Sequence, residues 1–140
     1  MNPDFCDLQK RYAELLMLLS PHKPRYSSQT SIQTRRGDDG SAHVERVNGN
    51  YHYVITERGS EIERKVAQSA YELMYWLADG VTTGIALQIE RENRIPGEDF
   101  RRQYFATNLR LLTRLSSEWA DWKRSEYQRI LIQHPYRDKV

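Results

Sequence analysis

The sequence predicts an α+β fold, in which an antiparallel β-meander of three to four strands has one face packed by about four helices. Three observations lead to this prediction. Apolar residues recur at helical spacing in residues 3–19 and again in 69–134, and they alternate with polar residues in 30–68. Turn signals divide that middle stretch into short strands. A length of 140 residues suits one domain, so we expect residues 1–140 to form a single domain.

The helical stretches carry recognisable start signals. Asn2 can cap the first helix, with Pro3 at its first position. Ser69 and Glu72 have the spacing of a capping box, in which a serine side chain and a glutamate three residues later satisfy free amides at a helix start. These signals predict helices that begin near residues 3 and 69.

Breaks within residues 69–134 divide this stretch into three helices. Pro96-Gly97 separates the first from the second, and Ser116 or Ser117 can cap the third. The third helix is expected to end near His134, because Pro135 disfavours helical backbone in the residue before it.

Two turn signals set the register of the meander. Asn48-Gly49 favours a type I′ turn because both residues tolerate positive φ, and Gly59-Ser60 has glycine first, as a type II′ turn requires. With these turns Ile55 faces Arg64 across the second hairpin. A turn at Arg58-Gly59 would move that pairing by two residues but keep the same faces.

The predicted sheet has one apolar and one polar face, because side chains alternate along a strand. We expect helices to cover the apolar face and the polar face to stay open. Glu57 and Arg64 are the charged exceptions on the apolar face, and we expect them to form a partly buried ion pair. The apolar face holds Ala42, Val44, Tyr51, Tyr53, Ile55, Ile62 and Val66. The polar face holds His43, Glu45, His52, Thr56, Arg58, Glu61, Glu63 and Lys65, with Val54 as an apolar exception.

Charge is distributed unevenly along the chain. The net charge is +2, but residues 51–100 carry five basic and nine acidic side chains, and residues 101–140 carry nine basic and four acidic ones. Cys6 is the only cysteine, so no intrachain disulfide can form and a reducing cytoplasm is the simplest compartment. Cys6 itself reads as a small buried side chain. No apolar stretch approaches the ~18 residues of a membrane span, so we expect no membrane association.

Motifs for catalysis are lacking, so we expect no enzyme activity and no cofactor. The sequence has neither a Gly-x-Ser-x-Gly elbow nor a glycine-rich phosphate loop. One alternative is a small metal-dependent enzyme, because His43, Glu45 and His52 come together on the polar face and are suitable zinc or iron ligands. Another is a nucleic-acid-binding module that uses the basic last third of the chain.

Residues 51–136 resemble a known family. The resemblance lies in "YHYVITERGSEIERK", "ELMYWLADGVTTGIA" and the long stretch that begins "GEDFRRQYFATNLRLL". On these residues the chain resembles immunity family 63 of bacterial polymorphic toxin systems. The residues that carry it are Tyr51, Tyr53, Glu57-Arg58-Gly59, Glu61, Gly97, Asp99, Phe100, Arg101, Trp119 and His134-Pro135.

The resemblance implies a bacterial cytoplasmic protein that binds and neutralises a cognate toxin encoded close to it, without catalysis. Nucleic acid is then not an expected partner, and the free protein is a monomer or small homo-oligomer. Two surfaces compete for the toxin. The favoured one is the polar sheet face, with Glu45, His52, Thr56, Arg58, Glu61 and Glu63. The alternative is a basic helical surface, with Arg110, Arg114, Trp122, Lys123 and Arg129.

Overall fold

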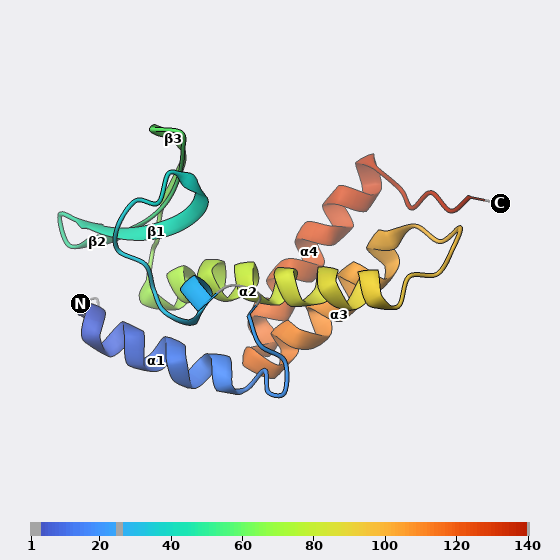
Figure 1. Ribbon diagram of the computed structural model, residues 1–140, viewed down its shortest axis with the longest axis horizontal. Coiled ribbons are helices and arrows are strands. Elements are labelled where there is room, and N and C mark those ends of the chain that lie inside the picture. The colour runs from blue at the N-terminus through green and yellow to red at the C-terminus, as the bar shows by residue number, and fades with distance from the viewer. Residues whose placement is uncertain (1–3, 25–26, 140) are drawn as a thin grey trace. The chain divides into compact units, whose positions relative to one another are not determined.

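One helix, a three-stranded antiparallel sheet and three longer helices follow one another in the computed structural model, which describes residues 4–24 and 27–139 (Figure 1). The α+β prediction is therefore confirmed. The predicted helix start at Asn2 and Pro3 lies outside the described residues. The elements are α1 (Phe5–Met17), the short 3₁₀ helix η1 (Ser27–Thr30), β1 (Asp39–Val47), β2 (Asn50–Glu57), β3 (Ser60–Val66), α2 (Ala70–Glu92), α3 (Phe100–Leu115) and α4 (Ser117–Gln133).

The chain divides into two compact units, which we call the sheet unit and the helical unit. The sheet unit comprises Met1–Met17 and Tyr26–Ala78, and the helical unit comprises Leu18–Arg25 and Asp79–Val140. Helix α2 contributes its first turns to the sheet unit and the remainder to the helical unit. The organisation as a single domain stays a prediction.

In the sheet unit, α1 and the first turns of α2 supply aromatic side chains to one face of the sheet. Phe5 of α1 meets Tyr51 edge to face at 5.5 Å, and Trp76 of α2 meets Tyr53 in the same way at 5.8 Å. Tyr51 is fully buried. This is the face predicted to be covered by helices. Its core is completed by Leu8, Tyr12, Val44, Leu73 and Met74.

The first hairpin has the predicted register, and the second does not. Val44 pairs with Tyr53 around an Asn48-Gly49 turn with φ of 51° and 81°, as predicted. The second turn is Arg58-Gly59, with φ of 50° and 82°, instead of Gly59-Ser60. A β-bulge then shifts the ladder by one residue, so that Ile55 pairs with Glu63.

The bulge reverses the faces predicted for the second half of β3, because a shift of one residue exchanges the two sides of a strand. Arg64 pairs with Val54, so it lies on the opposite face from Glu57 and the predicted ion pair is wrong. Ile62 and Val66 were expected against the helices but are 58% and 45% exposed. Lys65 takes the helix-facing side, with its ammonium 4.3 Å from the centre of the Trp76 ring.

The predicted polar face is only partly open. His43 and Thr56 are each 2% exposed, and Val54 is fully buried. The segment before β1 contacts this part of the sheet, since the amide of Asp38 donates to the hydroxyl of Thr56 at 3.1 Å. Farther back, the side-chain amide of Gln9 holds the same segment through two hydrogen bonds with the backbone of Ile32.

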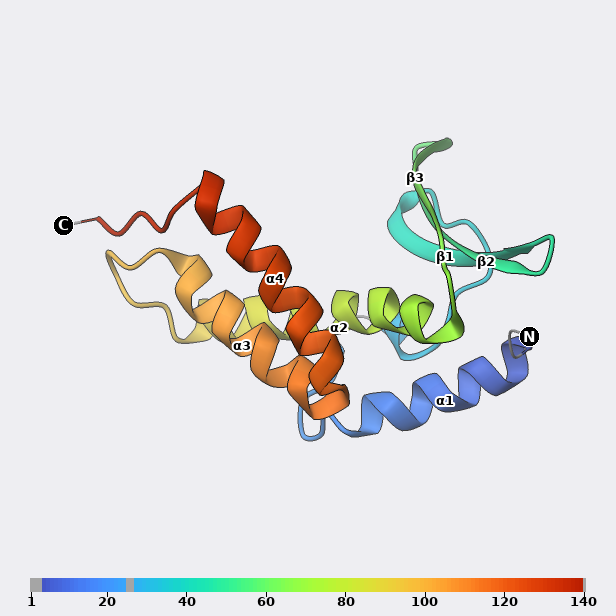
Figure 2. The same cartoon turned by 180° about the vertical axis from the view of Figure 1, so that it is seen from behind.

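In the helical unit, α3 and α4 lie side by side (Figure 2). Trp119 and Leu112 are buried between helices, and the rings of Phe105 and Tyr127 stack at 3.7 Å. The start signals are confirmed where they can be seen: Ser116 caps α4 and Ser69 caps α2. No helix within residues 4–24 and 27–139 is long and apolar enough to cross a membrane. Cys6 is exposed, against expectation.

Candidate partner-binding surfaces

Five polar side chains meet on the partly open face of the sheet, and we call them the Arg64 cluster: His43, Glu45, His52, Glu61 and Arg64. The guanidinium of Arg64 donates to Glu61 at 2.8 Å and to Glu45 at 3.0 Å, and its third nitrogen lies 2.9 Å from Nδ1 of His52. The other carboxylate oxygen of Glu45 lies 2.7 Å from Nε2 of His43. The cluster exists because the bulge turns Arg64 to this face.

Electrostatics in the cluster favour the charged forms of Glu45 and Arg64. The hydrogen bond from His43, followed by that from Arg64, lowers the pKa of Glu45. The two carboxylates raise the pKa of Arg64, with Glu61 contributing most. Glu45 thus bridges a buried histidine and a surface arginine, which fixes its carboxylate in one orientation.

The cluster does not have the geometry of a metal centre. Among residues 4–24 and 27–139 no group of three or more His, Cys, Asp or Glu side chains could hold a metal ion. The predicted ligands His43, Glu45 and His52 do lie near one another, but Arg64 engages two of them. A guanidinium is always cationic in proteins and has no lone pair to offer a metal.

The other predicted residues of this face have separate positions. Thr56 is buried, and its hydroxyl accepts a hydrogen bond from the amide of Asp38. It therefore attaches the segment before β1 to β2 and is not available to a partner. Arg58 is exposed at the turn. Glu63 was expected beside Glu61 but lies on the opposite face, 3.8 Å from the ammonium of Lys65.

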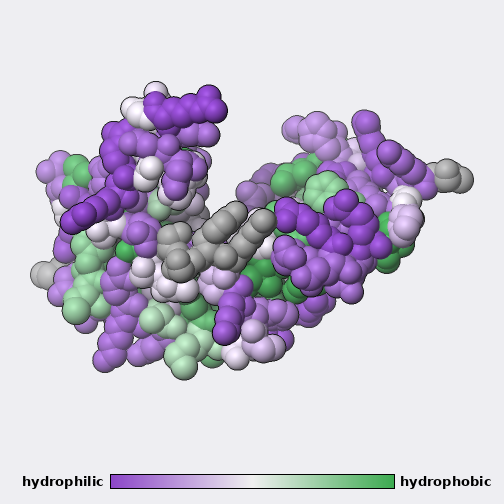
Figure 3. All heavy atoms as spheres, viewed as in Figure 1, coloured by the Kyte–Doolittle hydropathy of each residue, from purple (hydrophilic) through white to green (hydrophobic). Residues whose placement is uncertain are grey.

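Sequence reasoning missed three contributors to this surface. Arg64 was assigned to the wrong face, and Ile62 and Val66 were assigned to the core. No short motif marks the bulge, so only the packing of the sheet reveals them. We define the hairpin surface as Glu45, His52, Arg58, Glu61, Ile62, Arg64 and Val66. Its chemistry is charged and polar with two exposed aliphatic side chains, and the space-filling view shows a largely hydrophilic hairpin (Figure 3).

The alternative basic surface in the helical unit is weaker than the sequence suggested. Lys123 is only 8% exposed, and its ammonium contacts Asp79 at 2.9 Å and also Glu126. Arg114 donates to the backbone carbonyls of Leu19 and Ser20 at 3.4 Å. Arg110, Trp122 and Arg129 are exposed. Two of the five expected contact residues are therefore already engaged within the unit.

Lys123 belongs to a buried polar network in the helical unit. Its partner Asp79 also accepts from Asn108 at 3.3 Å, and Asn108 donates to the hydroxyl of Tyr127 at 2.8 Å. Asn108 is fully buried. Burial raises the pKa of Tyr127, so the phenol stays protonated. The network joins α2, α3 and α4 and gives Lys123 a structural role.

Comparison with known proteins identifies the family. A family model described as Immunity protein 63 matches residues 48–129, which is more than half of the chain. The chain therefore belongs to the Immunity protein 63 family, as the resemblance predicted. Neither the comparison with curated proteins nor that with solved structures finds a match.

Proposed function

We propose that this protein neutralises a cognate bacterial toxin by binding it directly in the cytoplasm, without catalysis. The family match over residues 48–129 carries the proposal. The geometry agrees with it, since the polar side chains of the sheet unit form a hydrogen-bonded cluster around Arg64 that offers a partner fixed charges. The partner is a toxin domain encoded beside the immunity gene.

We further propose the hairpin surface as the site of contact. Most of it lies within the matched residues, and its charges are held in place before a partner arrives. Such preorganisation lowers the side-chain entropy lost on binding. Opposite charges on the two proteins speed association and exclude wrong partners. Ile62 and Val66 supply apolar area beside these charges.

Growth rescue tests the function. The polypeptide encoded beside the immunity gene is expressed from an inducible promoter, with and without this protein. We expect growth to stop with the neighbouring polypeptide alone and to resume when both are present, and we expect the two purified proteins to co-elute. Continued growth arrest with both proteins folded and present would contradict the proposal.

A matched pair of charge reversals tests the contact surface. Glu61 and Glu63 are both exposed on β3, but the bulge places them on opposite faces. We expect Glu61→Lys to slow association with the toxin by about threefold to tenfold at low salt, because it reverses a charge on the hairpin surface. Glu63→Lys should leave the rate near that of the wild type. Stopped-flow kinetics measure both, and equal effects would move the contact away from this face.

A further inference from the structure

A second surface feature lies in the helical unit, where the loop between α2 and α3 meets the segment after α4. A hollow of about 430 Å³ opens there. The residues important for its chemistry are Arg94, Ile95, Phe100, Arg137 and Lys139. This volume lies within the range of roughly 300–1,000 Å³ typical of binding pockets. None of these residues belongs to either of the surfaces described above.

Residues 134–139 form one wall of the hollow, and hydrogen bonds hold them there. Arg101 donates to the carbonyls of His134 and Pro135 at 2.8 and 2.9 Å. The amide of Arg137 donates to the carboxylate of Asp99 at 2.8 Å, and the amide of Lys139 donates to the carbonyl of Gly97 at 2.7 Å.

Asp138 completes the attachment of this segment to the start of α3. Its carboxylate accepts from the amide of Asp99 at 2.8 Å and from Arg102 at 3.1 Å. Gly97 allows the close approach, since its φ is 83° and a Cβ there would lie 2.9 Å from the carbonyl oxygen of Lys139. Backbone and carboxylate contacts therefore hold this wall in place. These contacts do not involve the side chains of Arg137 and Lys139.

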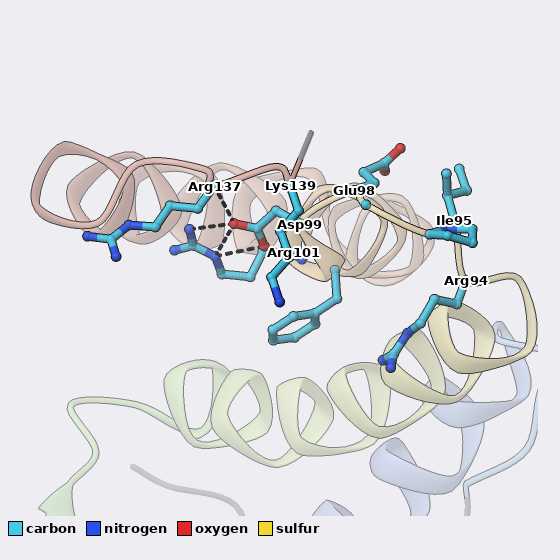
Figure 4. A pocket seen from close by; sticks show the side chains of 10 residues that line it. Arg94, Ile95, Glu98, Asp99, Arg101, Arg137 and Lys139 are labelled. Carbon is cyan, nitrogen blue, oxygen red and sulfur yellow. Dashed lines mark hydrogen bonds and ion pairs between the residues drawn. The ribbon is translucent and has the colours of Figure 1, made fainter.

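The hollow carries uncompensated positive charge. Arg94 is paired with Glu90 at 2.7 Å and Arg101 with Asp99 at 2.9 Å. In the described part of the chain, neither Arg137 nor Lys139 has a side-chain ion-pair partner. Figure 4 shows Lys139 and Arg94 extending toward the space between them, whereas the carboxylate of Glu98 extends away from it.

Apolar side chains border the same space. Ile95 is 50% exposed and Phe100 is 46% exposed, although both are large. An exposed aromatic next to cationic side chains is a frequent composition of interface anchors. The two kinds of group together suit a ligand that carries a carboxylate next to an apolar side chain.

We propose that this hollow binds an acidic segment of a partner protein, with a carboxylate at Lys139 in the space toward which Arg94 also extends, and an apolar side chain against Phe100 and Ile95. The identification of the partner as the toxin rests on the proposed function. The acidic and apolar character of the ligand is inferred from the residues of the hollow alone. The ligand of the hollow is expected to be negatively charged, whereas the partner group expected at Glu61 on the hairpin surface is positively charged.

Charge and shape favour a protein over a nucleic acid here. Nucleic-acid sites neutralise many phosphates along an extended basic surface, whereas only one cation that extends into this hollow, Lys139, lacks an ion-pair partner among the described residues. A single aspartate or glutamate side chain matches that number.

A peptide titration followed by NMR tests the proposal on the intact protein. The probe is an acetylated, amidated peptide Leu-Glu-Asp-Phe, and its matched control is Leu-Gln-Asn-Phe. We expect saturating shifts of the Gly97, Phe100 and Lys139 amides, with a Kd on the order of 1 mM, and about tenfold weaker binding of the control peptide. Absence of shifts, or equal shifts with both peptides, would overturn the proposal.

Two variants localise the binding. Arg137→Gln with Lys139→Gln should abolish the shifts and keep the remaining spectrum, because the backbone contacts of this segment do not use those side chains. Lys23→Gln with Arg124→Gln removes the same charge from exposed positions elsewhere in the unit and should bind as the wild type does. A short DNA duplex at low salt that shifts the same amides more strongly than the acidic peptide would assign the hollow to phosphate and overturn the proposal.

Measurements of toxin binding by the wild type and the double variant distinguish a failure of this inference from a failure of the proposed function. If the wild type binds toxin and the Arg137→Gln/Lys139→Gln variant binds it at least tenfold more weakly, the hollow contacts the toxin. If the variant binds toxin as the wild type does, the assignment of the toxin as partner fails while the proposed function stands. If the wild type binds no toxin, the proposed function fails, and the peptide titration still decides the chemistry of the hollow.

Discussion

The sheet unit and the helical unit both contain a cation bridged by two carboxylates, yet they place it differently. The side chain of Arg64 is 32% exposed, and its partners Glu45 and Glu61 are 37% and 45% exposed. The side chain of Lys123 is 10% exposed, and its partner Asp79 is 23% exposed. Water can replace a lost partner in the first case much more easily than in the second. Similar ion-pair geometry therefore forms part of an exposed surface in the sheet unit and stabilises the fold in the helical unit.

Asp79→Ala should have the largest effect on stability. It leaves the nearly buried ammonium of Lys123 with only its outer partner Glu126, and it removes an acceptor from Asn108. We expect a loss of about 2–4 kcal/mol in the free energy of unfolding, measured by urea denaturation. Glu126→Ala is the matched control and should cost less than about 1 kcal/mol, because Glu126 is 46% exposed. Similar losses for both would remove the distinction between buried and exposed partners.

Asp99→Asn should have the next largest effect and should depend on pH. Asp99 caps α3 and is held by Arg101, which lowers its pKa well below the ordinary value of 3.8. A lowered pKa stabilises the folded state fully above the unfolded pKa, and this contribution is lost as the pH falls through the folded pKa. We expect a cost of about 1–2 kcal/mol at neutral pH.

The pH profile of Tm checks the sign of this effect. The difference in Tm between the wild type and Asp99→Asn should be constant from pH 7 to about pH 5 and should shrink as the pH falls below 3.8. A difference that stays the same down to pH 2 would show that the carboxylate charge does not matter there.

Arg58→Asn should stabilise the protein slightly. Arg58 has a φ of 50° in the turn before Gly59, a region that asparagine tolerates better than arginine. The change creates an Asn-Gly type I′ turn like the one at Asn48-Gly49. We expect a gain of about 0.5–1 kcal/mol by thermal denaturation. A loss of stability would indicate that the Arg58 side chain makes contacts that outweigh its backbone strain.

Arg64→Ala should change the stability least of the four and should change toxin binding most. The side chain lies on the surface, so water solvates Glu45 and Glu61 after its removal, although the two carboxylates then repel each other. We expect a small fall in Tm and a clear loss of toxin affinity, measured by differential scanning fluorimetry and calorimetry. A fall in Tm as large as that of Asp79→Ala would show that the Arg64 cluster holds the sheet together.

The sequence predicted local structure well and long-range placement less well. The Asn48-Gly49 turn and the caps at Ser69 and Ser116 depend on neighbours within a few residues, so short patterns reveal them. Burial of Thr56 depends on Asp38, which is 18 positions away. The hollow depends on Asp138 meeting Asp99, which are 39 positions apart. No local pattern carries such information.

The candidate surface shows the same limit. Glu45, His52, Arg58 and Glu61 were assigned to this face from alternation alone, because the first hairpin has the predicted register from Ala42 to Val47 and Glu61 precedes the bulge. The face of Arg64 was predicted wrongly because a bulge depends on how the twisted strands and the helices pack, and a single residue of slip is enough to reverse it.

The bulge at Ile62 also has a consequence for how this protein can evolve. Without Ile62, Glu61 would precede Glu63 directly and the ladder with Thr56 and Ile55 would be regular, with Arg64 still on the face of Glu45. Deletion of the bulged residue would therefore leave the charged side chains on the same face, whereas a shift of one residue elsewhere in a strand exchanges its two faces.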